Sequence, residues 1–331
     1  MKICVLGDGG WGTALAIVLH RNGHSVRVWG PFPDYSREVE TSRRNEKYLA
    51  GVDLPDGLRF TADHEEAARD ADGIVIAVPS KFYRNVMEQF RGRVPPDTMV
   101  VSVTKGLDAE TYGRMSDVAQ EVLGLNSVCV LSGPSHAEEV ARGVPSAIAI
   151  ACPDHDDAVR FQSIFNSPAF RVYTSTDIVG VELGGAMKNV IAVAAGISDG
   201  IGFGDNTKAA LVTRGLAEIS RLGAALGAQP TTFAGLSGIG DLIVTCMSRL
   251  SRNRGVGEQL GSGRSLEEIM GSMEQVAEGV WTCVTAKKLG QDRGVDLPIT
   301  AEVYAVVHEG KDPRRAVQDL LARDPKPERD T

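Results

Sequence analysis

Short apolar runs rich in β-branched residues alternate with longer segments over residues 1–175. Runs this uniformly apolar are typical of strands buried on both faces of a parallel sheet, with crossover helices between them. The pattern predicts a doubly wound α/β fold with a mainly parallel sheet. The expected strands are Lys2–Leu6, Ser25–Trp29, Leu58–Phe60, Gly73–Val78, Thr98–Val103, Ser127–Leu131, Ser146–Ala151 and Phe170–Thr174.

The spacing of apolar residues becomes helical after residue 176. One segment carries Val190, Ile191, Ala194 and Ile197 on one face, and a second helix is expected from Asn206 or Thr207 to about Gly227. We therefore predict two domains, a sheet domain over residues 1–176 and an all-helical domain over residues 177–331. Further helices are expected at Val303–His308 and Arg314–Arg323.

The net charge and the hydropathy of the chain argue against several classes of function. The chain of 331 residues has a net charge of -8 and no long basic run, which argues against a nucleic-acid or anionic-membrane partner. The longest uncharged stretch, Leu222–Gly240, contains Pro, Gln, Thr and several Gly residues and is no membrane span. The first apolar run, Ile3–Leu6, is too short for a signal peptide. We expect a cytoplasmic protein without an integral membrane segment.

The cysteines are odd in number and form no CxxC pair. Several lie inside apolar runs, which is typical of reduced thiols packed as small hydrophobic residues. The sequence therefore predicts neither disulfides nor a metal site. The five residues are Cys4, Cys129, Cys152, Cys246 and Cys283.

A GxGxxG motif follows the first expected strand and precedes a helix. Gly7 allows the tight turn, Gly9 lets a pyrophosphate approach the backbone, and Gly12 allows close packing of the helix on the strand. The free N–H groups and the helix dipole then face the phosphates. Residues 1–176 are accordingly predicted to bind a dinucleotide, whereas a plain glycine-rich turn is the alternative.

The end of the second strand lacks the usual cofactor selector. In this fold a carboxylate there holds the ribose 2′-OH of NAD, and an arginine accommodates NADP. The chain instead reads Trp29-Gly30-Pro31, and Asp34 and Arg37 come later. The residues at the end of this strand therefore do not predict whether the cofactor is NAD or NADP.

One lysine interrupts an otherwise small and apolar helix. Lys188 and Asn189 lie between Glu182 and Asp199, the nearest charged residues on either side. Burying an ammonium costs several kcal/mol unless it is paired or loses its proton. Lys188 is therefore either a helix-edge lysine that reaches solvent or a catalytic lysine. The adjacent glycines at 184–185 favour catalysis, because they allow another backbone or a ligand to come close.

Four further positions carry candidate chemistry, each with a simpler alternative. Lys105 follows a strand at the edge where open α/β sheets bind ligands, but it also suits a solvated loop. Ser135 follows the next strand in a Gly-Pro turn. Asp241 is either a site carboxylate or a helix N-cap. The segment 251–254, Ser-Arg-Asn-Arg, offers two guanidiniums for a phosphate, or is a surface basic cluster.

Taken in order, these segments resemble the bacterial type of NAD(P)-dependent glycerol-3-phosphate dehydrogenases. The resemblance covers nearly the whole chain and rests on long blocks. They are GDGGWGTALA at the start, VTKGLD at 103–108, SGPSHAEEVARGVPSA at 132–147, GGAMKNVIAVAAGISDGIGFGDNTKAAL at 184–211, GLSGIGDLIVTC at 235–246 and SRNR at 251–254.

The resemblance implies an oxidoreductase that interconverts sn-glycerol 3-phosphate and dihydroxyacetone phosphate with NAD or NADP and feeds glycerophospholipid synthesis. It also implies a homodimer formed through the helical domain. By the same resemblance, Lys188 is the catalytic lysine, aided by Lys105 and Asp241. The implied substrate contacts are Lys105, Gly133, Ser135, Lys188, Asp241, Ser251, Arg252 and Asn253. The implied cofactor contacts are Gly7, Gly9, Gly10, Trp11, Gly12, Lys105, Ala137, Arg252, Val276 and Glu278.

The chain departs from the family pattern at two positions. Gly10 stands where serine is common, a change expected to cost little because the backbone makes the contact. Pro31 stands where a basic residue or histidine often holds the adenosine end, which puts an NADP preference in doubt.

Two other functions remain as alternatives. One is another two-domain reductase, of the 3-hydroxyacid or 6-phosphogluconate dehydrogenase type, against which the SRNR segment and Lys105 argue. The other is a dinucleotide sensor without turnover, which would not need Lys105, Lys188 and Asp241 together.

Overall fold

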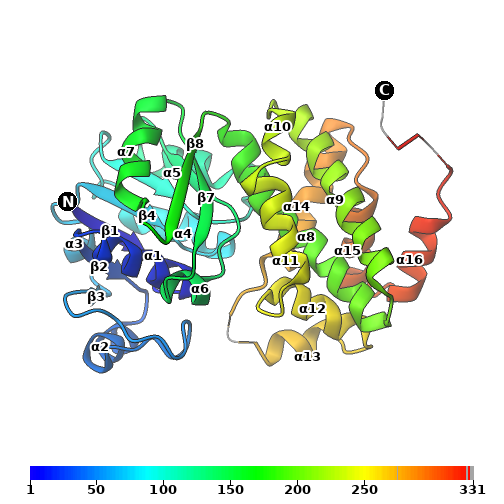
Figure 1. Ribbon diagram of the computed structural model, residues 1–331, viewed down its shortest axis with the longest axis horizontal. Coiled ribbons are helices and arrows are strands. Elements are labelled where there is room, and N and C mark those ends of the chain that lie inside the picture. Colours follow the sequence, from blue (N-terminus) through cyan, green and yellow to red (C-terminus); the bar gives the residue numbers. More distant parts are fainter. Residues whose placement is uncertain (274, 326, 329–331) are drawn as a thin grey trace.

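The computed structural model describes residues 1–273, 275–325 and 327–328. Figure 1 shows a sheet domain built from the first half of the chain beside a bundle of helices built from the second half. The fold class expected from the sequence is confirmed: a Rossmann-type, mostly parallel sheet domain is followed by an all-helical domain.

The sheet has eight strands in the order β3-β2-β1-β4-β5-β6-β7-β8. Strands β6 and β7 pair antiparallel, and the other neighbouring pairs are parallel. All eight expected strands are present, with ends that differ from the prediction by at most two residues. Their bounds are β1 Lys2–Leu6, β2 Ser25–Trp29, β3 Arg59–Thr61, β4 Gly73–Ile76, β5 Met99–Ser102, β6 Cys129–Ser132, β7 Ser146–Ala151 and β8 Phe170–Ser175.

Helices cover both faces of this sheet, which explains the continuous apolar runs of its strands. Successive residues of β1 point to opposite faces, so that Val5 belongs to one hydrophobic cluster and Leu6 to the other. The helices of this half are α1 Gly10–Arg21, α2 Pro33–Ser42, α3 His64–Ala68, α4 Ser80–Phe90, α5 Met115–Leu123, α6 Ala137–Ala141 and α7 His155–Phe165.

The second half contains helices joined by short turns. The helix expected from residue 206 or 207 is α9, and Val303–His308 is the second half of a longer helix that starts at Pro298, where proline suits the first helical position. A kinked turn, η1, spans Leu236–Gly240. The helices are α8 Ile178–Ile201, α9 Asp205–Ala225, α10 Pro230–Phe233, α11 Asp241–Met247, α12 Arg252–Gly261, α13 Leu266–Gly271, α14 Glu278–Arg293, α15 Pro298–His308 and α16 Pro313–Leu321.

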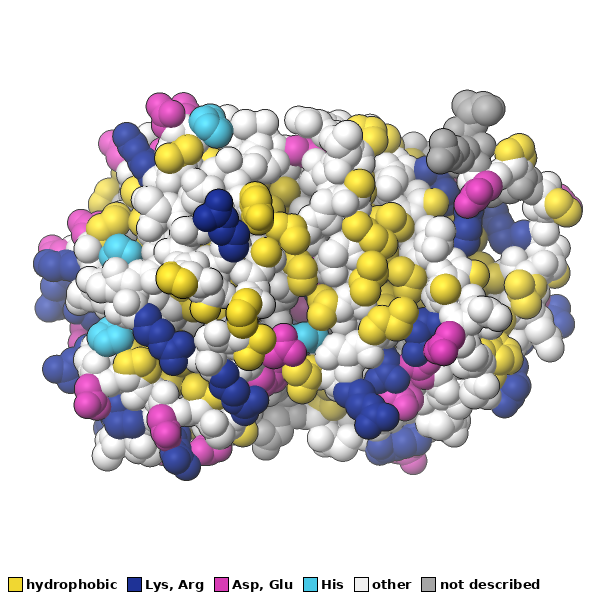
Figure 2. Space-filling model, viewed as in Figure 1, with side chains coloured by type: hydrophobic (Ala, Val, Ile, Leu, Met, Phe, Trp, Pro, Cys, Tyr) yellow, Lys and Arg dark blue, Asp and Glu magenta, His cyan; other side chains and the backbone are white. Residues whose placement is uncertain are grey.

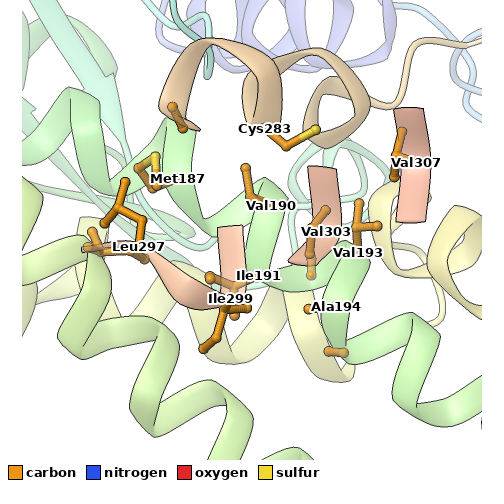
Figure 3. Packing of buried hydrophobic residues seen from close by; sticks show 14 of the residues in the cluster. Met187, Val190, Ile191, Val193, Ala194, Cys283, Leu297, Ile299, Val303 and Val307 are labelled. Atoms are coloured by element: carbon orange, nitrogen blue, oxygen red, sulfur yellow. The ribbon is translucent and has the colours of Figure 1, made fainter. Parts of the chain in front are cut away.

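Helix α8 is the centre of the helical domain. By length and composition it could cross a membrane, but 83% of its most apolar stretch is buried inside the protein, so it is a core helix. Figure 3 shows Val190, Ile191 and Val193 of α8 beside Cys283, Ile299 and Val303 of the surrounding helices. Burying this all-round apolar surface holds α8 in place along with any polar group it carries.

The expectation of five reduced thiols is wrong in part. Cys129 and Cys152 form a disulfide between residues 23 positions apart. Antiparallel pairing of β6 with β7 places Val130 opposite Ala151, which brings the two cysteines together just beyond that pair. Neither the odd count nor the absence of CxxC reveals such a pairing, because it depends on strand order. Cys4, Cys246 and Cys283 are free and buried, as expected.

Charged side chains of both signs are interspersed over the face in Figure 2, and hydrophobic side chains gather around its middle, where the two halves meet. The charge excess of -8 is therefore spread rather than collected into one acidic face in this view. An anionic ligand has to be bound by local basic residues.

Candidate active site

The glycine turn between β1 and α1 forms one wall of the site. Gly7 has a φ of +116°, and a Cβ there would lie 2.6 Å from the carbonyl oxygen of Ala77. Gly12 lies so close to Gly7 that a side chain would overlap the Gly7 carbonyl. Both positions therefore require glycine, for the reasons the motif predicts.

The open side of the turn suits an anionic ligand. A Cβ built on Gly9 meets nothing within 4 Å, and the start of α1 has no side-chain cap. Its first N–H groups are therefore available to a pyrophosphate. A Cβ on Gly10 would overlap the Tyr48 carbonyl, so glycine suits this position of the chain.

Lys188 lies on α8 and is only 7% exposed. Its ammonium Nζ donates to Oδ1 of Asp241 at 2.7 Å and to the hydroxyl of Thr245 at 2.6 Å. Burial lowers the pKa of Lys188 to about 8; Asp241 opposes this shift, and the Lys105 ammonium adds to it. Lys188 is thus an amine that changes protonation near neutral pH.

Lys105 follows β5 at the carboxyl edge of the sheet and contacts the same carboxylate. Its Nζ donates to Oδ2 of Asp241 at 2.7 Å, to the Gly133 carbonyl at 2.8 Å and to the Ser135 hydroxyl at 3.2 Å. These contacts involve three residues that the family resemblance implies as substrate contacts. They also fix the lysine, so the solvated-loop alternative is wrong.

Asp241 joins the two lysines across the two halves of the molecule. It is the first residue of α11, but its side chain makes no N-cap hydrogen bond, so the simple capping alternative is wrong. Burial would raise the pKa of Asp241, whereas the Lys105 and Lys188 ammoniums lower it below its usual value. The carboxylate therefore stays ionised and orients both amines.

The two glycines before Lys188 permit this arrangement, as expected. A side chain at Gly184 would overlap the Ser237 carbonyl of η1, and one at Gly185 would overlap the Ser132 hydroxyl. The turn that leads into Asp241 and the end of β6 can therefore both approach α8. Larger residues would move the lysine and the carboxylate apart.

The residues of the SRNR segment, 251–254, have different roles. Some lie in the wall of the site, and others hold the surrounding structure. The Ser251 hydroxyl caps α12, and Asn253 accepts from the Gly279 N–H at 2.8 Å and donates to Asn189 at 2.9 Å. Arg252 is exposed and lines the site cavity. Arg254 instead pairs with Asp199 at 2.7 Å, away from the expected phosphate contacts.

These groups surround one cavity of about 460 Å³ that runs from the glycine turn to α12. Gly7, Gly12, Gly133 and Asp241 do not line it but lie behind residues that do. The expected site residues in its wall are Gly9, Gly10, Trp11, Lys105, Ser135, Ala137, Lys188, Ser251, Arg252, Asn253, Val276 and Glu278.

Sequence reasoning missed several polar residues in or beside this cavity, three of which contact expected site residues. Thr245 accepts from Lys188 and donates to the Asp241 carbonyl at 2.6 Å, and its position one helical turn after Asp241 was the available signal. Asn189 donates to the Lys105 carbonyl at 3.1 Å. Ser80 binds the carboxylate of Glu278 through its N–H and its hydroxyl. No local pattern marks Ser80.

Protein-family models and sequence relatives identify the same enzyme family for this chain. Two protein-family models match: the NAD-dependent glycerol-3-phosphate dehydrogenase N-terminus over residues 2–158 and the corresponding C-terminus over residues 177–318. Glycerol-3-phosphate dehydrogenase (NAD(P)+) of Prosthecochloris aestuarii is 52% identical, with 99% of this chain and 100% of that protein covered. The corresponding protein of Geobacillus kaustophilus is 51% identical, with 99% and 96% covered.

A solved structure agrees with the sequence matches. The crystal structure of glycerol-3-phosphate dehydrogenase from Coxiella burnetii superposes with a TM-score of 0.94 and 36% identity, covering 97% of this chain and 99% of that one.

Proposed function

Because the chain belongs to the NAD(P)-dependent glycerol-3-phosphate dehydrogenases and has that enzymatic activity, we propose that Lys188 is its acid–base residue. The reaction interconverts the secondary alcohol of sn-glycerol 3-phosphate and the ketone of dihydroxyacetone phosphate. The nicotinamide, when bound, supplies or accepts the hydride at C2. The chain itself has to move a proton at the C2 oxygen and hold the phosphate.

The single observation that carries the proposal is the position of the Lys188 amine. It is buried, it lines the cavity that begins at the glycine turn, and its pKa of about 8 allows both protonation states near neutral pH. Neutral Lys188 accepts the hydroxyl proton in the oxidative direction. As an ammonium it polarises the ketone and donates the proton in the reductive direction.

Asp241 and Lys105 support this step. Two of the three hydrogen positions on the Lys188 ammonium are taken by Asp241 and Thr245, so the third is left for the substrate oxygen. Lys105, held by Asp241, Gly133 and Ser135, places a fixed positive charge beside the substrate. Arg252, with Ser251 and Asn253, would bind the substrate phosphate.

The cofactor contacts follow from the same cavity. The turn through Gly7, Gly9 and Gly12 and the start of α1 suit the pyrophosphate, because no side chain occupies that face. Gly10, Trp11, Ala137, Arg252, Val276 and Glu278 line the remaining path toward Lys188. We divide the chain into a cofactor domain, 1–176, and a substrate domain, 177–331, because strand β8 ends at Ser175 and α8 begins at Ile178.

Three broader statements are proposals that follow from the family. They are a homodimer formed through the helical domain, a cytoplasmic location, and a role in supplying glycerol 3-phosphate for glycerophospholipid synthesis. Size-exclusion chromatography with light scattering tests the first, and a monomer at micromolar concentration would contradict it.

Replacing the amine tests the proposal directly. We expect Lys188→Ala to lower kcat for dihydroxyacetone phosphate reduction by about two or more orders of magnitude, the usual range for an acid–base group. NADH binding, measured by fluorescence titration, should be nearly unchanged. The control is Lys288→Ala, which removes an exposed lysine paired with Asp292 on α14. Full activity of Lys188→Ala would exclude Lys188 as the acid–base residue.

A further inference from the structure

Asp8, the second residue of the glycine motif, has a buried carboxylate with an unused oxygen. The residue is 6% exposed, and Oδ2 has no hydrogen-bond partner among the described residues. Leaving a buried acceptor unpaired costs free energy, so native proteins usually supply a donor. Oδ2 is enclosed by the protein, whereas Oδ1 has no hydrogen-bond partner among the described residues and is not enclosed. Oδ1 is therefore the oxygen that a ligand hydroxyl can reach.

The carboxylate of Asp8 lies at the end of the second strand. A Cβ built on Gly30 would overlap Oδ2, Cγ and Cβ of Asp8. Strands β1 and β2 are parallel neighbours, with Leu6 opposite Trp29, so the residues that follow them lie at the same edge of the sheet. The carboxylate therefore occupies the space that a side chain at position 30 would fill.

In dinucleotide-binding sheets, the side chain at this position contacts the cofactor. A carboxylate at the end of the second strand accepts hydrogen bonds from the adenosine ribose hydroxyl of NAD. Here the strand ends in glycine and proline, but Asp8 supplies a carboxylate from the neighbouring strand to the same place. Gly30 has no side chain that could exclude it.

Positive charge contributes little at the Asp8 carboxylate. Arg37 on α2 pairs with Asp34, and both side chains are largely exposed. Lys47 lies over the Tyr48 ring at 5.2 Å and, among the described residues, is the cation that lowers the pKa of Asp8. Burial outweighs it and raises that pKa to about 6, which leaves the carboxylate ionised above neutral pH.

We propose that Asp8 makes this enzyme select NAD(H) over NADP(H). Its carboxylate accepts a hydrogen bond from the ribose 2′-OH of NAD(H) and repels the 2′-phosphate of NADP(H). The inference rests on the proposed function of the glycine turn as the dinucleotide site. It assigns a specificity role that does not depend on Lys188 or on catalysis.

Equilibrium binding tests the selection without turnover. We measure the Kd of NADH and of NADPH for the full chain by fluorescence titration in the absence of substrate. The wild-type protein should bind NADH at least tenfold more tightly than NADPH. Asp8→Asn removes the charge and keeps the shape, and should reduce this preference by roughly ten- to a hundredfold, the range of one charged hydrogen bond.

Asp34→Asn is the matched control, because it removes one carboxylate from the segment just after β2 where the side chain is exposed. It should leave the preference unchanged. A preference that changes in Asp34→Asn but not in Asp8→Asn would overturn the proposal. So would a wild-type protein that prefers NADPH, a result that needs no variant and stands even if Asp8→Asn fails to fold.

Two binding outcomes distinguish the dinucleotide site from the role of Asp8. If neither NADH nor NADPH binds, the dinucleotide site at the glycine turn is wrong. If both bind equally and Asp8→Asn changes nothing, the site stands and only the role of Asp8 is overturned.

Discussion

The Asp241 carboxylate lies between two ammonium groups, and at the scale of single residues this decides when Lys188 carries a proton. Lys105 and Asp241 together are neutral. A proton on Lys188 therefore adds an unbalanced positive charge in a buried place, which low dielectric makes unfavourable. Losing that proton is correspondingly easier than for an exposed lysine.

The pH dependence of turnover follows from this arrangement. Oxidation of glycerol 3-phosphate needs neutral Lys188 and should rise with pH through about 8, whereas ketone reduction needs the ammonium and should fall over the same range. Asp241 raises the pKa of Lys188, so Asp241→Asn should move the midpoint to lower pH. Lys105 lowers that pKa, so Lys105→Met should move it higher.

The measurement is kcat against pH for the residual activity of each variant. Both midpoints moving in one direction would contradict the assignment, because the two charges act on Lys188 with opposite signs.

Arg252 and Arg254 lie two positions apart but are expected to behave differently. Arg252→Ala should raise the KM for dihydroxyacetone phosphate about tenfold or more, because a charged phosphate contact is lost. Arg254→Ala should change KM little and lower the melting temperature, because Arg254 pairs with Asp199 and Glu258. Steady-state kinetics and thermal denaturation of both variants check this. An unaltered KM in Arg252→Ala would remove the phosphate assignment.

At the scale of elements, glycines bring α12 against α8. Side chains at Gly196 and Gly200 of α8 would overlap backbone carbonyls of Arg254 and Glu258, and a side chain at Gly257 would overlap the Val193 carbonyl. The two helices therefore meet backbone to backbone. This contact places Ser251, Arg252 and Asn253, at the start of α12, beside the Lys188 region of α8.

Two alanine substitutions in α12 should have opposite effects. Gly257→Ala should lower the free energy of unfolding by about 1–3 kcal/mol because the new methyl group has no room. Gly255→Ala meets nothing within 4 Å and should raise it by roughly 0.5–1 kcal/mol, since alanine favours the helix. Urea denaturation measures both. Equal effects would contradict the close approach of α12 to α8.

At the scale of the whole molecule, the site exists only where the two halves meet. The glycine turn and Lys105 come from the sheet domain, whereas Lys188, Asp241 and Arg252 come from the helical domain (Figure 1). Besides the Lys105–Asp241 pair, Ser80 at the start of α4 joins Glu278 at the start of α14. Lys81 lies over the Trp281 ring at 4.5 Å next to this contact.

Loosening this second junction should weaken cofactor binding. Ser80→Ala removes one of the two hydrogen bonds to the half-buried Glu278 carboxylate, which lines the cavity. We expect the Kd of NADH to rise by about three- to tenfold, because Glu278 is less well held. Ser163→Ala, on the surface of α7, is the control. Unchanged NADH affinity in Ser80→Ala would mean that the junction does not position the cofactor site.

Periodicity and motif made much of this protein predictable. Apolar runs and helical spacing are local properties, so the eight strands, the all-helical second half and the special glycines at 7 and 12 followed from the sequence. Lys188 stood out because an ammonium in an apolar helix is costly wherever that helix lies. The resemblance then added the reaction and the remaining site residues.

Tertiary structure alone decided which distant groups touch. The Cys129–Cys152 disulfide depends on the antiparallel β6–β7 pair. The Ser80–Glu278 contact depends on how α4 meets α14, and the placement of Asp8 against Gly30 depends on the β1–β2 register. The physical reason is common to all three: sequence determines how each segment folds along its own axis, whereas side-chain contacts between segments are determined by packing in three dimensions.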